Sequence, residues 1–142
     1  MTWTYLNKPI TELPDNIVGF VYIITNLITG KRYIGKKLAK FSKTRYKMHT
    51  QKNGKRVKKK IRTKIDSDWL TYWGSSELLA KDIELFGTHS FSREILRMCE
   101  SKAECSYYEA KEQFYNGVLE SDLWYNAQIS VRLHKTHILG KF

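Results

Sequence analysis

The stretch from Gly19 to Lys37, GFVYIITNLITGKRYIGKK, decides the fold of this chain. Two runs rich in β-branched and aromatic residues, Phe20 to Thr25 and Arg32 to Ile34, lie on either side of Asn26 to Gly30. The Asn, Thr and Gly residues between the runs favour a tight turn, because they tolerate the required backbone angles or hydrogen-bond to their own backbone. The stretch therefore predicts a β-hairpin, around which the rest of the chain is arranged.

Each strand of this hairpin carries one tyrosine, Tyr22 on the first and Tyr33 on the second. Side chains alternate between the two faces along a strand, so the register of the pairing decides whether both phenols lie on the same face. Most tyrosines in strands are half-buried packing residues. On the pattern alone, this interpretation applies to both.

The spacing Asn-x-x-Thr-Gly-Lys-x-Tyr-Ile-Gly, from Asn26 to Gly35, is a specific motif. Together with Val21-Tyr22 it resembles the paired signature of the GIY-YIG nuclease superfamily. The second half, Tyr33-Ile34-Gly35, is intact, whereas Phe20-Val21-Tyr22 stands where the family usually has Gly-Ile-Tyr. Downstream, LLAKDIELFGTHSFSREILRMCESKAE resembles a later passage of the family, so the similarity covers roughly Gly19 to Asn126. The resemblance is to small phage-type, Seg-like endonucleases of the homing type.

The remaining pattern indicates an α+β fold. Apolar residues at helical spacing predict a helix from Glu77 to Phe86 and a second from Ser101 to Gly117, with Ser101 as its N-cap. Between them, the short apolar run from Phe91 to Cys99 predicts a third strand. We therefore expect a single domain over residues 1–142, with a three-stranded antiparallel sheet flanked by helices. The resemblance implies the same fold.

Three segments lie outside this pattern. Met1 to Asn16 carries both prolines and is predicted to be an irregular lead-in. The basic insertion, about residues 36–64, contains no acidic residue, and part of it is expected to be disordered without a ligand. Its first half, Leu38 to Gln51, is predicted to be helical, and Lys52 to Lys55 to form a turn. A short basic C-terminal tail ends the chain.

The charge of the chain indicates an anionic partner. Lys and Arg number 25 against 14 Asp and Glu, a net charge of +11, and the isoelectric point is near 9.7. Nucleic acid is the commonest partner of so basic a domain. The insertion lacks the large apolar residues of a membrane-surface helix, and no apolar run is long enough to span a bilayer. Cys99 and Cys105 have no histidine at ligand spacing, so we expect neither zinc site nor disulfide, as in an intracellular protein.

Hydrolysis of a phosphodiester requires a proton acceptor near the attacking water, cations on the phosphate and usually a divalent metal on a carboxylate. The resemblance assigns Tyr22 as the base that activates water and Tyr33 as its positioning partner. Gly35 would keep the backbone clear where the phosphate approaches. A phenol has a pKa of about 10, so Tyr22 acts as a base at neutral pH only if cations or a metal lower that pKa.

Arg45 and His49 are the candidates for the phosphate and for proton relay. They lie four residues apart, so a helix places them on one face. The resemblance assigns them as the catalytic arginine and the histidine that often accompanies it. An Arg-x-x-x-His match arises easily by chance in a run this basic. Arg62 is the alternative, if the basic insertion moves the functional arginine downstream.

Glu109, in the second predicted helix, matches the glutamate with which the family coordinates Mg²⁺ or Mn²⁺. Mg²⁺ keeps several waters and needs only one or two carboxylates. The competing carboxylates are otherwise explained, Glu104 by helix capping and Glu112 by ordinary exposure. Asn126 matches an asparagine common at the end of the family domain and is predicted to support the site.

Basic residues in and before the insertion are predicted to contact DNA phosphates, which gives salt-dependent affinity with little sequence readout. These residues are Lys36, Lys37, Lys58, Lys59, Lys60 and Arg62. The aromatic cluster of Trp69, Tyr72 and Trp73 can stack on bases, although packing is the commoner role of such residues.

The resemblance thus implies a metal-dependent DNA endonuclease that leaves 5′-phosphate and 3′-hydroxyl ends. A Seg-like protein is expected to be phage-encoded and to act in the cytoplasm of a bacterial host. A homodimer is one way for it to cut both strands. Three alternatives remain open: a non-catalytic nucleic-acid-binding module on the same fold, a nuclease of RNA, and a protein that coats nucleic acid.

Overall fold

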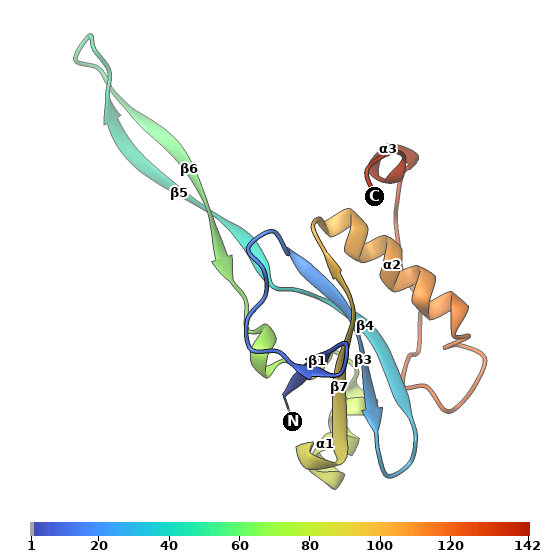
Figure 1. Cartoon of the computed structure of the whole chain (residues 1–142). Coiled ribbons are helices and arrows are strands. Elements are labelled where there is room, and N and C mark those ends of the chain that lie inside the picture. The colour runs from blue at the N-terminus through green and yellow to red at the C-terminus, as the bar shows by residue number, and fades with distance from the viewer. Residues whose placement is uncertain (1) are drawn as a thin grey trace.

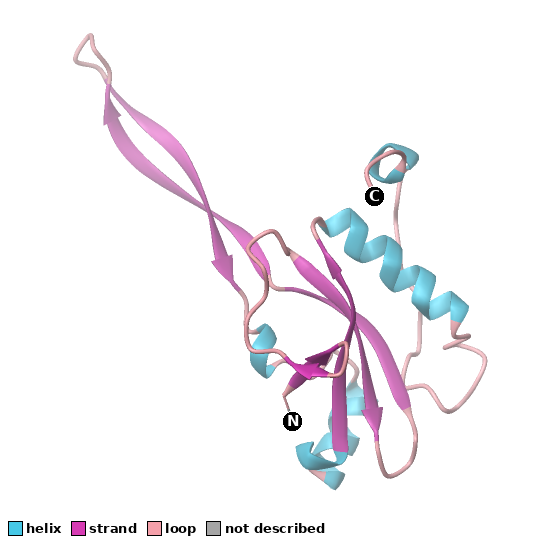
Figure 2. Cartoon of the chain, viewed as in Figure 1, coloured by secondary structure: helices cyan, strands magenta, loops and turns pink. Residues whose placement is uncertain are grey.

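The elements of the computed structural model, which describes residues 2–142, are shown in Figures 1 and 2. The strands are β1 (Trp3–Tyr5), β2 (Lys8–Pro9), β3 (Gly19–Asn26), β4 (Arg32–Leu38), β5 (Lys40–Thr50), β6 (Arg56–Asp66) and β7 (Phe91–Cys99). The helices are α1 (Glu77–Phe86), α2 (Lys102–Tyr115) and α3 (Lys135–Ile138), with 3₁₀ turns η1 (Trp69–Thr71) and η2 (Thr88–Ser90).

Five strands form one mixed sheet in the order β2-β1-β7-β3-β4. Strand β3 pairs antiparallel with both β4 and β7, which are the three strands predicted from the sequence. Strand β1 runs parallel to β7 and pairs antiparallel with β2. The α+β class is therefore confirmed, but the prediction of a three-stranded antiparallel sheet is wrong, because two N-terminal strands extend it.

These extra strands lie in the segment predicted to be an irregular lead-in. Leu6 and Asn7 adopt positive φ angles, 50° and 66°, and turn the chain between β1 and β2. Pro9 lies in an edge strand, where its missing N–H breaks no ladder. Trp3 is fully buried, and its indole N–H donates to the backbone oxygen of Trp69 at 2.8 Å. A contact distant in sequence, rather than a local pattern, thus anchors β1.

The sheet carries a core on each face. One contains Trp3, Phe20 and Tyr22 and is completed by residues of η1 and α1. The other contains Val21 and Ile34 and lies against residues of α2. Because successive side chains of β3 point to opposite faces, each face receives its own set of apolar side chains.

Helices α1 and α2 form where they are predicted. The Ser76 hydroxyl accepts from the Leu79 N–H at the start of α1. At the start of α2, the Ser101 hydroxyl accepts from the Glu104 N–H at 3.1 Å. The Glu104 carboxylate in turn accepts from the N–H of Glu100, so each side chain caps part of the helix start. Within residues 2–142, no helix has both the length and the apolar character needed to cross a membrane.

The basic insertion forms a long two-stranded antiparallel ribbon of β5 and β6, here called the β5–β6 ribbon. It projects away from the sheet in Figure 1. The helix predicted for Leu38 to Gln51 is therefore wrong. The apolar residues Val57, Ile61 and Ile65 lie at even spacings in β6, a strand period that the density of lysines conceals. Gly54, with a φ of 83°, turns the chain at the tip.

Candidate active site

The pairing of β3 with β4 brings both signature tyrosines to one face of the sheet. Tyr22 lies opposite Gly35, and Tyr33 lies opposite Ile24. Residues paired in this way, and residues two apart in a strand, share a face. The two ring centroids are 6.1 Å apart, so the register makes the phenols neighbours.

Gly35 leaves the space that the phenol of Tyr22 occupies. A Cβ atom at Gly35 would lie 2.6 Å from the Tyr22 hydroxyl oxygen and 2.9 Å from the ring of Tyr33. The missing side chain therefore lets Tyr22 lie against the backbone of β4. The sequence predicts that Gly35 leaves room for the phosphate of the substrate. In the structure, the phenol of Tyr22 occupies the room beside Gly35.

We expect Gly35→Ala to lower the free energy of unfolding by about 1–3 kcal/mol, the usual effect of overpacking a core. It should also reduce DNA cleavage at least about tenfold, because Tyr22 is displaced. The control is Gly30→Ala, which strains a backbone with φ 81° but meets no atom within 4 Å. Thermal unfolding and plasmid cleavage measure the two effects. A Gly35→Ala protein that loses only stability would show that the position of Tyr22 is unimportant.

The segment between β6 and α1, residues 67–76, packs over the two phenols. The rings of Tyr72 and Tyr22 are 6.0 Å apart, and Tyr72 raises the pKa of Tyr22. The Ser75 and Tyr33 hydroxyls lie 3.2 Å apart. Between Tyr72 and Ser75 in the chain, Gly74 adopts a φ of 88°, which favours glycine. The sequence predicts packing or base stacking for Tyr72, and the Gly-Ser-Ser turn after it is typical of any loop, so neither signal places these residues beside the phenols.

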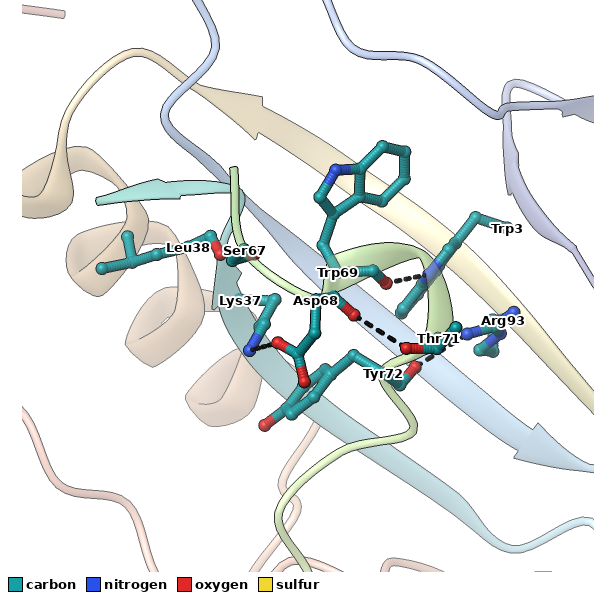
Figure 3. A network of polar contacts seen from close by, with 9 residues as sticks. All are labelled: Trp3, Lys37, Leu38, Ser67, Asp68, Trp69, Thr71, Tyr72 and Arg93. Atoms are coloured by element: carbon teal, nitrogen blue, oxygen red, sulfur yellow. Dashed lines mark hydrogen bonds and ion pairs between the residues drawn. The ribbon is translucent and has the colours of Figure 1, made fainter. Parts of the chain in front are cut away.

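A network of polar contacts attaches this segment to the sheet (Figure 3). The Lys37 ammonium lies 2.7 Å from the Asp68 carboxylate and 4.1 Å from the centroid of the Tyr72 ring. Hydrogen bonding and charge from Lys37 hold the pKa of Asp68 below its ordinary value. The Arg93 guanidinium donates to the backbone oxygen of Tyr72 at 2.8 Å. Lys37, predicted to contact DNA, is thus paired with a carboxylate beside the site.

Burial raises the pKa of both signature phenols. Tyr22 has no exposed surface, and the neighbouring Tyr33 and Tyr72 raise its pKa further. For Tyr33, burial also raises the pKa, and a hydrogen bond with Ser75 partly opposes this effect. Both phenols are therefore protonated at neutral pH in the protein alone. The lowered pKa that a base needs has to come from bound DNA or cations.

Glu109 reaches the site from α2, across the edge strand β4. Its carboxylate lies close enough to Lys36 for the charge and the backbone N–H of that residue to lower its pKa. Burial raises the pKa of Glu109, and the charge of Lys36 opposes this rise. The charge of Glu109 contributes, after burial, to the raised pKa of Tyr22 and of Tyr33. The carboxylate is therefore close enough to act electrostatically on both phenols.

Side chains also form hydrogen bonds with the backbone at the outer edge of β4. Asn126 accepts from the N–H of Ile34 at 3.1 Å and donates to the Ile34 carbonyl at 2.8 Å. Gln113 donates to the same carbonyl at 3.0 Å. Asn126 thereby makes the two hydrogen bonds of a neighbouring strand. It continues a backbone pairing on this edge, where Arg32 forms a parallel bridge with Trp124.

A cleft of about 410 Å³ opens beside this edge. Its lining includes Tyr33 and Ser75 from one face of the sheet and Glu109, Gln113 and Asn126 from the other side. A phosphate in this cleft meets the phenol side and the carboxylate side of β4 at once.

The donor set suits one class of metal. Within residues 2–142, no three His, Cys, Asp or Glu side chains are grouped as a metal site. A single carboxylate fits Mg²⁺ or Mn²⁺ completed by waters, and does not fit Zn²⁺, which takes three or four protein ligands. A divalent cation would also stabilise the ionised form of Glu109 against the penalty of burial.

Three other predicted residues lie on the ribbon, outside the cleft. Arg45, His49 and Arg62 are exposed residues of β5 and β6. Arg45 is separated from Lys40, the first residue of β5, by roughly 16 Å of strand. The prediction that Arg45 and His49 are adjacent on a helix is wrong, because four residues of a strand span roughly 13 Å. Lys36, by contrast, lies at the site and donates to the Ser106 hydroxyl at 2.7 Å.

Comparison with known families agrees with this geometry. Residues 3–129 match a family model described as "Putative endonuclease segE, GIY-YIG domain". Neither the curated proteins nor the solved structures compared with the chain include a significant match. The matched range contains both signature tyrosines, Glu109 and the β5–β6 ribbon. The chain therefore belongs to the GIY-YIG nuclease superfamily, within its Seg-like type.

Proposed function

We propose that this protein is a metal-dependent DNA endonuclease that hydrolyses phosphodiester bonds and leaves 5′-phosphate and 3′-hydroxyl ends. Membership of a nuclease family implies nuclease activity and DNA as substrate. The observation that supports the mechanism is the convergence of Tyr33 and Glu109, distant in sequence, on one cleft beside the buried Tyr22.

In this mechanism Tyr22 takes the proton of the attacking water, and Tyr33 orients that water. Tyr33 is partly exposed and lines the cleft, so it meets the water first. Tyr22 is enclosed by Tyr33, Tyr72 and Gly35, so its hydroxyl becomes accessible only when Tyr33 or the segment of Tyr72 moves. DNA binding beside this segment is the natural cause of such a movement.

Glu109 would hold the Mg²⁺ or Mn²⁺ ion. When bound, this ion supplies positive charge to the phosphate as its negative charge increases in the transition state. Lys36 stabilises the ionised form of Glu109 by its charge and adds a cation beside the cleft. Arg45 and His49 pair with Ile61 and Val57 on the ribbon, far from the cleft, so we assign neither of them a role in the chemical step.

DNA binding outside the cleft is assigned to exposed cations of the ribbon. Lys58, Lys60 and Arg62 lie on one face of β6 and Lys59 on the other, since side chains alternate. Such contacts supply affinity that falls with salt. Because one site cuts one strand, we propose that a homodimer or two successive nicks produce a double-strand break. The phage origin, the homing role and the bacterial cytoplasm are proposed from the family resemblance.

A second candidate function is a nucleic-acid-binding module without turnover. Two observations favour it: the arginines predicted to be catalytic lie on the ribbon, and burial raises the pKa of the phenol assigned as the base. Conversion of supercoiled plasmid with Mg²⁺ or Mn²⁺, beside a gel shift, distinguishes the two. Nicked or linear product supports the endonuclease. A DNA complex that never cuts with either metal supports the binding module.

The rate of cleavage should rise about tenfold per pH unit between about pH 7 and 9. The raised pKa of Tyr22 means that the phenolate is a minor species in this range, and its fraction grows tenfold with each unit. Single-turnover cleavage at saturating enzyme and metal measures the slope. A rise or a plateau that persists unchanged in Tyr22→Phe would identify another base, such as a histidine.

A further inference from the structure

The two faces of the β5–β6 ribbon differ in side chains. Residues paired across the ladder share a face, and alternate residues of one strand share a face. Every second residue of β6 from Arg56 to Lys64 is basic, and this side of the ribbon is here called the basic face. Its cations from β6 are Arg56, Lys58, Lys60, Arg62 and Lys64.

The opposite side, here called the apolar face, carries the apolar residues of both strands near the base. Phe41 pairs with Ile65, and Ile61 and Val57 follow along β6. Its lysines include Lys43 and Lys47 of β5. The side chains of Val57, Ile61 and Ile65 are partly buried, whereas the β6 cations of the basic face are exposed. The basic face is therefore the side on which exposed cations follow one another along β6 without partly buried apolar residues between them.

The dimensions of the ribbon match duplex DNA. Each strand has 11 residues, which at about 3.3 Å per residue is roughly 36 Å. One turn of B-DNA rises about 34–36 Å. The major groove is about 12 Å wide and admits a two-stranded β-ribbon. From residue 40 to residue 65 the ribbon has no acidic residue to repel the phosphates that flank a groove.

We propose that the β5–β6 ribbon lies in the major groove of duplex DNA, with its basic face toward the bases, along about one helical turn to one side of the cleaved phosphate. This rests on the proposed function, because the cleft beside β4 defines where the phosphate is. The ribbon begins only two residues after β4, so its contacts extend from the site outward in one direction.

The basic face carries the groups that major-groove contacts use. Arginine and lysine donate to the O6 and N7 atoms of guanine. Tyr46 and Met48 of β5 pair with Lys60 and Lys58 and are 66% and 47% exposed. Such side chains can contact the methyl group of thymine, which lies in the same groove. This face therefore suits base edges as well as phosphates.

The test compares two double variants matched in every respect but the face. Lys60→Ala/Lys64→Ala removes two lysines of the basic face, and Lys43→Ala/Lys47→Ala removes two of the apolar face. Both pairs are four residues apart, and they lie at similar distances from the base of the ribbon. All four side chains are exposed, so thermal unfolding should match the wild type in both variants. Binding is measured by gel shift on a 40-base-pair duplex in EDTA, which prevents cleavage.

We expect the basic-face variant to raise Kd at least about tenfold and to lower the salt slope by about 1.8, the counterions of two contacts. The apolar-face variant should stay within about threefold of wild type. Methylation of guanine N7, which lies in the major groove, should weaken binding of wild type more than of the basic-face variant. Equal losses in both variants, or no effect of N7 methylation, would overturn the placement in the groove.

A cleavage assay keeps this proposal separate from the proposed function. If wild type cuts plasmid and the basic-face variant binds DNA as tightly as wild type, the ribbon contact is refuted and the endonuclease function stands. If wild type binds DNA through the basic face but never cuts it, the endonuclease function is refuted and the ribbon contact stands. A footprint that extends about 10 base pairs to one side of the cleavage position supports the direction of the ribbon.

Discussion

Glu109→Gln is expected to reduce the rate of DNA cleavage by about a thousandfold, the size of loss expected when one charged group at a reacting phosphate is removed. Glutamine keeps the shape of the side chain and an oxygen that can accept from the Lys36 N–H. The charge that would hold the metal is lost. DNA binding in EDTA should be unchanged or slightly tighter, because a negative charge beside the cleft disappears. Single-turnover cleavage with Mg²⁺ and gel shift measure both effects.

Stability should change in the opposite direction from activity. The pKa of Glu109 is raised in the folded protein, so at neutral pH its ionised form is disfavoured by folding. That penalty is present above the folded pKa and is relieved as pH falls toward the unfolded value. Glu109→Gln removes the penalty, so the midpoint of thermal unfolding at pH 7 should be equal to or above that of wild type. Lost activity then does not arise from unfolding.

The matched control is Glu112→Gln on the same helix. Glu112 accepts a hydrogen bond from the Asn116 side chain at 3.3 Å and does not line the cleft. Its substitution should leave cleavage within about threefold of wild type, as is usual for a surface change. If Glu112→Gln removed cleavage and Glu109→Gln did not, the metal ligand would be Glu112. Cleavage that survives both changes would show that neither carboxylate holds the metal.

Tyr22→Phe is expected to lower the rate of cleavage by about 10²–10⁴-fold, the range for loss of a general base. The ring stays in its pocket against Trp3 and Phe20, where centroids are 5.3 Å and 6.1 Å away. Only the hydroxyl and its polar interaction with Tyr72 are lost. The stability change should therefore be no more than about 1.5 kcal/mol. Plasmid cleavage, gel shift and thermal unfolding test the three statements.

Tyr72→Phe separates positioning from proton transfer. It removes the polar interaction with Tyr22 from the other side and leaves the Tyr22 hydroxyl in place. We expect cleavage to fall about tenfold or less and the rise of rate with pH to remain. In Tyr22→Phe that rise should disappear from the residual activity. Equal losses in both variants would mean that the pair of phenols matters and that Tyr22 is not itself the base.

Much of the sheet and both long helices could be predicted because their signals are local. Alternating β-branched residues around Asn26 to Gly30 specify the hairpin, and Ser101 caps α2 as predicted. Glu109 could be singled out because the motif places it on α2. Tyr72 and Ser75 could not, because they reach the phenols only through the fold.

The errors have physical causes of two kinds. In the basic insertion, the density of lysines concealed a period of two, so a helix was predicted where Val57, Ile61 and Ile65 specify a strand. At the N-terminus, the strand of Trp3 is short and is stabilised by burial and by its bond to Trp69, 66 residues away. Local sequence propensities cannot predict a contact between residues so far apart in the chain.

The amino-acid sequence alone was sufficient for the family, the hairpin and the identity of the two phenols, because residue type and short spacing carry that information. The register of β3 against β4, the route of the ribbon and the edge contacts of Asn126 depend on pairing between distant segments. The same holds for the electrostatics of the site. Burial raises the pKa of Tyr22 and of Glu109, and burial is a property of the packed fold rather than of neighbouring residues in the chain.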